Sequence, residues 1–100
     1  MTDVRIDRES RPDGSGSVVT IVGELDLDTA GQLADVLEGC HGEIVVNVEG
    51  VTFMDSSGLG TLIRARNRVM DEGGQLSVRG ARDNVRRLFQ VTGLADYLVD

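Results

Sequence analysis

The 100-residue chain contains few of the residues that crosslink or stiffen a small protein. It has one cysteine, one proline and no tryptophan, and aromatic residues make up 3% of it. A single cysteine excludes an internal disulfide. Apolar residues still account for 40% of the chain, so the core must consist of Val, Leu, Ile and Ala. Such a core favours a compact α/β layer over an aromatic-rich sandwich.

Lysine is absent, and all ten basic residues are arginines set among seventeen acidic residues. The net charge is −7 and the sequence pI is about 4.5. Nucleic-acid-binding domains normally carry a basic face, and anionic membranes attract basic segments, so neither is an expected partner. An acidic chain more readily binds a protein whose surface has complementary charge.

Long hydrophobic runs are also missing. No stretch approaches the length of a membrane span. The first nine residues, MTDVRIDRE, lack the basic and then apolar pattern of a signal peptide. We therefore expect a cytoplasmic protein, and its length predicts a single domain over residues 1–100.

Hydrophobic periodicity divides the chain into strands and helices. Val4 and Ile6 indicate a first strand, which precedes the loop RPDGSGS and pairs antiparallel with the next strand. The other predicted elements are a strand in 17–25, a helix in 28–39, a strand in 43–48, a helix after 55, a strand in 75–80 and a helix around 85–92. The order β-β-α-β-α-β-α predicts an α/β fold with a mixed, mostly parallel sheet of four to five strands packed against helices. The tail LADYLVD is expected to form a short helix or strand.

Three local features are predicted in more detail. Thr29 and Gln32 have capping-box spacing, with Asp28 as the alternative cap of the first helix. The apolar run EIVVNV suggests a strand buried on both faces. In the second helix, the expected buried face includes the apolar residues Leu59, Leu62, Ile63 and Met70.

Two loops draw attention because each follows a strand and starts a helix. They contain the sequences GELDLDTA and FMDSSGLGTL. In an open parallel sheet, functional sites gather at the carboxyl ends of the strands. We therefore expect Asp26, Asp55 and Ser56 to lie near one another at one edge of the sheet.

Several roles are conceivable for the serine pair. Ser56 could simply cap the second helix. A catalytic nucleophile would need a base, but the only histidine, His41, is expected at the opposite edge, and the Gly-x-Ser-x-Gly elbow is absent.

A phosphate-binding loop is disfavoured, since the chain has no lysine and Asp26 and Asp55 would repel the phosphate. Two aspartates, or Cys40 with His41, are too few for a metal site. No catalytic residue, metal or cofactor is therefore expected. Phosphorylation fits better, because a hydroxyl at the start of a helix is accessible and would gain about −1.5 to −2 charges.

These motifs together resemble the STAS domain of the bacterial anti-sigma factor antagonists. The resemblance covers residues 18–94 and includes GELDLDTA, EIVVNVEGVTFMDSSGLGTL, GGQLSV and NVRRLFQVTGL. It implies a sheet with helices packed against it. It also implies a protein that binds an anti-sigma factor with ATP-dependent serine kinase activity, and so frees a sigma factor. The kinase would phosphorylate Ser56 and inactivate the antagonist, and a separate serine phosphatase would restore it.

The resemblance makes the two loops the expected partner-binding surface. In GELDLDTA, Leu25 and Leu27 share one parity if the strand continues, so both could be buried. The alternative that we favour is that Leu25 enters the core while Leu27, nearer the edge of the sheet, stays exposed as a partner anchor. The expected partner-binding residues are Asp26, Leu27, Thr29, Asp55, Ser56, Ser57, Gly58 and Leu59.

Two other functions stay open on the sequence. An unmodified STAS scaffold within a larger complex would share the fold but would not need an intact Asp-Ser-Ser triplet. A small hydrolase or nucleotide-binding enzyme would need a base, a lysine or a metal set that the sequence does not offer.

Overall fold

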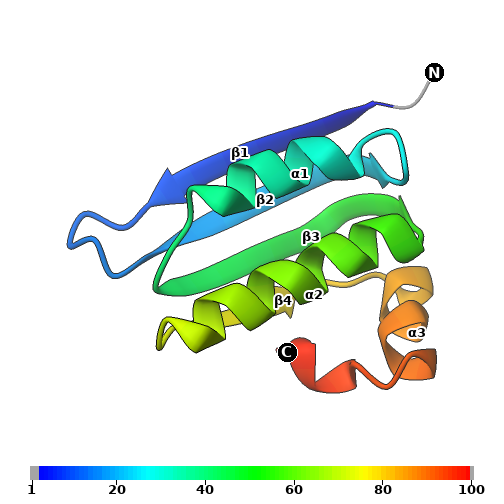
Figure 1. Ribbon diagram of the computed structural model, residues 1–100. Coiled ribbons are helices and arrows are strands. Elements are labelled where there is room, and N and C mark those ends of the chain that lie inside the picture. Colours follow the sequence, from blue (N-terminus) through cyan, green and yellow to red (C-terminus); the bar gives the residue numbers. More distant parts are fainter. Residues whose placement is uncertain (1–2, 100) are drawn as a thin grey trace.

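The computed structural model describes residues 3–99, which form a four-stranded sheet with helices packed on it (Figure 1). The strands lie in the order β1-β2-β3-β4, with β1 antiparallel to β2 and the other pairs parallel. The elements are β1 (Val4–Ser10), β2 (Gly16–Leu25), α1 (Ala30–Glu38), β3 (Glu43–Met54), α2 (Ser56–Asp71), β4 (Gln75–Arg79), α3 (Asp83–Val91) and the 3₁₀ helix η1 (Ala95–Tyr97). The predicted order of elements and the mixed, mostly parallel sheet are both confirmed.

Helices α1 and α2 lie side by side over the same face of the sheet (Figure 1). Burial along β3 therefore alternates. Ile44, Val46 and Val48 are fully buried, whereas Val45 and Asn47 on the other face are only partly covered. The prediction that this strand is buried on both faces is wrong, because the apolar run continues the sheet but only one face has helices over it.

The face that α2 buries differs in part from the predicted one. Leu59 and Leu62 are buried as expected, and Ala65 and Val69 complete the buried stripe. Met70 was expected in this face but is 50% exposed, because its neighbour Val69 occupies the core position at the last turn of the helix.

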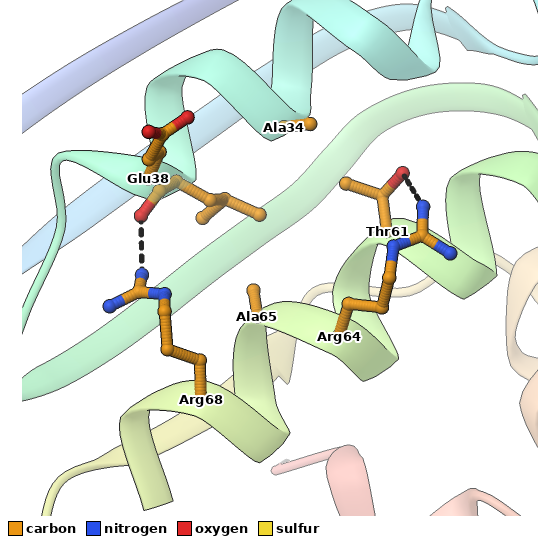
Figure 2. A pocket seen from close by; sticks show the side chains of 7 residues that line it. Ala34, Glu38, Thr61, Arg64, Ala65 and Arg68 are labelled. Carbon is orange, nitrogen blue, oxygen red and sulfur yellow. Dashed lines mark hydrogen bonds between the residues drawn. The ribbon is translucent and has the colours of Figure 1, made fainter. Parts of the chain in front are cut away.

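An arginine ties the two neighbouring helices together. Arg68 of α2 donates hydrogen bonds to the carbonyl oxygens of Leu37 (2.7 Å) and Cys40 (2.9 Å), at the end of α1. Figure 2 shows Arg68 pointing from α2 toward that end of α1, across a cavity of about 180 Å³ between the helices. The Leu37 carbonyl also accepts from the backbone N–H of Cys40 (2.9 Å), so Arg68 adds a second bond there and links α2 to the residues that end α1.

The C-terminal segment closes the far edge of the sheet. Tyr97 of η1 packs 6.0 Å from the ring centre of Phe89, and the Arg66 guanidinium lies 4.0 Å from the Tyr97 ring centre. Leu98 then pairs in parallel with Val78 of β4. The tail thus forms both a short helix and a strand contact. Within residues 3–99, no helix is long and apolar enough to cross a membrane.

Candidate functional site

The two predicted loops meet at the edge of the sheet where β2 and β3 end, which we call the carboxyl rim (residues 26–29 and 55–59). Leu25 and Met54, the last residues of the two strands, are paired in register. The backbone N–H of Asp55 donates to the carbonyl of Leu25 across the gap, at 3.1 Å. The structure therefore brings the two loops together, as the parallel arrangement predicted.

Asp55, rather than Ser56, caps α2. Its backbone is extended (φ −110°, ψ −172°), and its Oδ1 accepts hydrogen bonds from the backbone N–H groups of Ser57 (2.8 Å) and Gly58 (3.4 Å). Ser56 is the first helical residue. The capping role considered for Ser56 is therefore wrong, because an aspartate one residue earlier is an equally good N-cap.

The two serines differ in accessibility. Ser56 is exposed, whereas Ser57 is half-buried. Among residues 3–99, no group forms a hydrogen bond with the Ser56 hydroxyl. The Ser56 hydroxyl is therefore presented to solvent at the positive end of a 16-residue helix.

The Asp26 loop is held by its own side chains. The Thr29 hydroxyl donates to the carbonyl of Glu24 (2.8 Å) and accepts from the backbone N–H of Asp26 (2.9 Å). Asp26 Oδ1 accepts from the backbone N–H groups of Asp28 (2.9 Å) and Thr29 (3.2 Å). The predicted capping box of Thr29 with Gln32 is wrong, since Thr29 uses its hydroxyl to close the preceding loop. This network fixes the Asp26 carboxylate on the rim.

The two leucines of GELDLDTA differ in burial, as expected. Leu25 is fully buried, whereas Leu27 is 78% exposed. Sequence reasoning missed a second apolar surface nearby, formed by Phe53 of β3 with Leu88 and Val91 of α3 around a cavity of about 330 Å³. Phe53 is 46% exposed, and its alternation with the buried Met54 was a signal that could have identified it.

Gly58 allows α2 to start close against β2. A Cβ at this position would lie 2.7 Å from Cγ of Leu25 and 3.1 Å from the Leu25 carbonyl oxygen. Because Leu25 is fully buried, it has little room to move. We expect Gly58→Ala to lower the free energy of unfolding by about 1–2 kcal/mol, since overpacking outweighs the helix-propensity gain. Urea denaturation measures this change.

Gly60, two residues later in the same helix, is the matched control. A Cβ there would meet only the end of the flexible Arg64 side chain, at 3.3 Å. Gly60→Ala should therefore stabilise the protein by about 0.5–1 kcal/mol. Equal effects of the two substitutions would show that close packing at Gly58 is not what requires glycine.

His41 lies at the other end of α2, as predicted. Its Nδ1 is 3.1 Å from Glu72 Oε1 and 3.3 Å from Arg68 Nη1. The hydrogen bond with His41, together with the nearby positive charge of Arg68, lowers the pKa of Glu72. The helix between Ser56 and this group is roughly 24 Å long, so His41 cannot act as a base for Ser56. In the described part of the chain, no three His, Cys, Asp or Glu side chains are grouped as a metal site.

Comparison with known proteins agrees with this architecture. Residues 10–100 match the family model described as "Mlab, STAS domain". The chain is 36% identical over 85 residues to the anti-sigma-B factor antagonist of Staphylococcus aureus (strain NCTC 8325 / PS 47), covering 80% of this chain and 78% of the relative. The corresponding protein of Staphylococcus epidermidis is 35% identical over the same shares of both chains.

Solved structures give the same answer for the fold. The Bacillus cell fate determinant SpoIIAA in its phosphorylated form has a TM-score of 0.77 and 25% identity, covering 96% of this chain and 90% of that one. An anti-sigma factor antagonist from Mycobacterium paratuberculosis has a TM-score of 0.81 at 24% identity, covering 96% and 83%. The family model and the sequence relatives agree with the sheet topology and with the two loops at the carboxyl rim. The chain therefore belongs to the STAS domain family of bacterial anti-sigma factor antagonists.

Proposed function

We propose that this antagonist is a partner switch controlled by phosphorylation of Ser56. In its unphosphorylated form it binds an anti-sigma factor that is also a serine kinase, and so frees a sigma factor in the cytoplasm. The kinase transfers the γ-phosphate of ATP to the Ser56 oxygen, ADP leaves, and the complex dissociates. A serine phosphatase hydrolyses the phosphoserine and restores binding. The chain itself supplies no catalysis, cofactor or metal in this scheme.

The exposed Ser56 hydroxyl is the observation that carries the proposal. Asp55 already satisfies the backbone donors at the start of α2. The Ser56 oxygen therefore has no structural bond to break before it attacks a phosphorus atom. Ser57 is a poorer acceptor because it is half-buried.

The remaining rim residues divide by exposure into two proposed roles. Leu27 and Ser56 are exposed, and Asp26, Asp55 and Ser57 are half-buried, so these five form the proposed contact surface. Three buried residues hold that surface in shape: Thr29 through its loop hydrogen bonds, Gly58 through its contact with β2, and Leu59 through the core.

The acceptor is tested by incubating the protein with its kinase and ATP and locating the phosphate by mass spectrometry. We expect one phosphate, on Ser56. Ser57→Ala should still be phosphorylated, and Ser56→Ala should not. Because Asp55 forms the cap, Ser56→Ala should change the free energy of unfolding by no more than about 0.5 kcal/mol and should still bind the kinase.

Other outcomes would change the assignment. A phosphate on Ser57 or Thr29 would move the acceptor. A protein that binds its partner stably but is never phosphorylated would instead be an unmodified STAS scaffold.

A further inference from the structure

A second polar cavity lies at the opposite edge of the sheet, where β2 and β3 begin. Its volume is about 190 Å³, and its polar side chains are Arg8 and Ser10 of β1, Ser17 of β2 and His41 of the loop after α1. Glycines form much of the remaining wall. Neither the resemblance nor the proposed switch uses any of these residues.

Ser17 is the most unusual member of this cavity. Its side chain is only 3% exposed, yet within residues 3–99 its hydroxyl has no hydrogen-bond partner. Buried hydroxyl groups nearly always have a partner. Every fully enclosed side-chain oxygen or nitrogen in the described chain is satisfied, so the Ser17 oxygen must be reachable from the cavity that it lines.

Arg8 supplies a positive charge without a counter-charge. No carboxylate of residues 3–99 forms an ion pair with it. Its guanidinium lies over Gly39, where an added Cβ would be 2.7 Å from Nη1. Two neighbouring acidic residues are already paired, Glu43 with Arg11 at 2.6 Å and Glu72 with His41 at 3.1 Å, whereas Glu9 and Glu38, which adjoin lining residues in the chain, form no ion pair within residues 3–99. Arg8 is therefore a cation at this cavity that no ion pair within residues 3–99 neutralises.

We propose that this cavity binds a phosphate group. Arg8, Ser17 and His41 line it from β1, β2 and the α1–β3 loop, and an arginine beside further hydrogen-bonding side chains suits the several acceptor oxygens of a phosphate group. A volume of about 190 Å³ is enough for one phosphate group.

The test is a titration of ¹⁵N-labelled protein with inorganic phosphate at constant ionic strength, followed by amide chemical shifts. We expect saturable changes at Gly16, Ser17 and Gly39, and none at the carboxyl rim. Arg8→Gln should weaken binding about tenfold or more, and Ser17→Ala about threefold or more, because each removes a hydrogen bond to a charged ligand.

Arg5→Gln is the matched control, since Arg5 lies on the same strand but pairs with Asp7 and does not line the cavity. It removes the same charge and should leave the affinity unchanged within about twofold. A second titration with glycerol phosphate shows whether the natural ligand is free phosphate or a phosphate ester. Tighter binding of glycerol phosphate than of inorganic phosphate indicates an ester, and weaker binding indicates free phosphate.

Arg8 also lies at the C-terminal end of α1, where a cation stabilises the helix. A purely structural role would lower the melting temperature of Arg8→Gln but would not produce saturable shifts in the wild type. Shifts that do not saturate, or equal losses of affinity in Arg8→Gln and Arg5→Gln, would overturn the proposal.

Discussion

Phosphorylation of Ser56 should weaken binding to the anti-sigma factor kinase by about thirtyfold or more, because an interface that fits a bare hydroxyl must desolvate or exclude the phosphate dianion. The stability of the free protein should change by less than about 1 kcal/mol. The phosphate gains from the helix dipole at the first residue of α2, but it also lies on the rim with Asp26 and Asp55. These two effects oppose each other.

Calorimetric titration of both forms with the kinase measures the loss, and amide chemical shifts report on the fold. Shift changes should stay on the carboxyl rim, because Leu59 and Leu62 hold α2 in the packed core. Ser56→Asp and Ser56→Asn form a matched pair that separates charge from shape. Equal affinities of the two phosphorylation states, or shifts spread through the core strands, would refute the local mechanism.

Leu27→Ala should weaken kinase binding by about tenfold or more, because burying a leucine in an interface contributes about 1.5–3 kcal/mol. The side chain is 78% exposed in the free protein, so nothing in its own core depends on it. The same substitution should leave the free energy of unfolding within about 0.5 kcal/mol of wild type.

Met70→Ala is the control for this experiment. Met70 is also an exposed apolar residue, at 50%, but it lies near the end of α2 that is far from the rim. Its replacement should not affect kinase binding. If both substitutions weaken binding equally, or neither does, Leu27 is not an anchor of the interface.

Much of the fold and the location of the site followed from the sequence. The change from alternating to helical periodicity gave the order of elements. Parallel strands then required the two loops to share an edge, as the pairing of Leu25 with Met54 shows. The position of Leu27 beyond the end of the strand, nearer the rim than Leu25, correctly favoured it as the exposed leucine.

The errors arose where neighbouring residues have similar local preferences. Asp55 and Ser56 are both good N-caps, so local propensity could not decide which of them begins the helix. Val69 and Met70 are both apolar, and the choice between them depends on how α2 rotates over the sheet. Whether helices cover one face of β3 or both depends on the packing of the whole chain, and the apolar run of a single strand does not reveal it.

Because Asp55 is the cap, the evolutionary constraint on residue 55 differs from the constraint on its neighbour, residue 56. Residue 55 is constrained by folding, because its carboxylate accepts the backbone hydrogen bonds that hold the first turn of α2. In the proposed switch residue 56 serves regulation, and within residues 3–99 no hydrogen bond involves its hydroxyl oxygen. A lineage could thus lose the acceptor, exchange it for threonine or fix a permanent negative charge there without passing through an unstable intermediate. Under the proposed switch, single substitutions at residue 56 would convert this backbone between switched, constitutively active and constitutively silent antagonists.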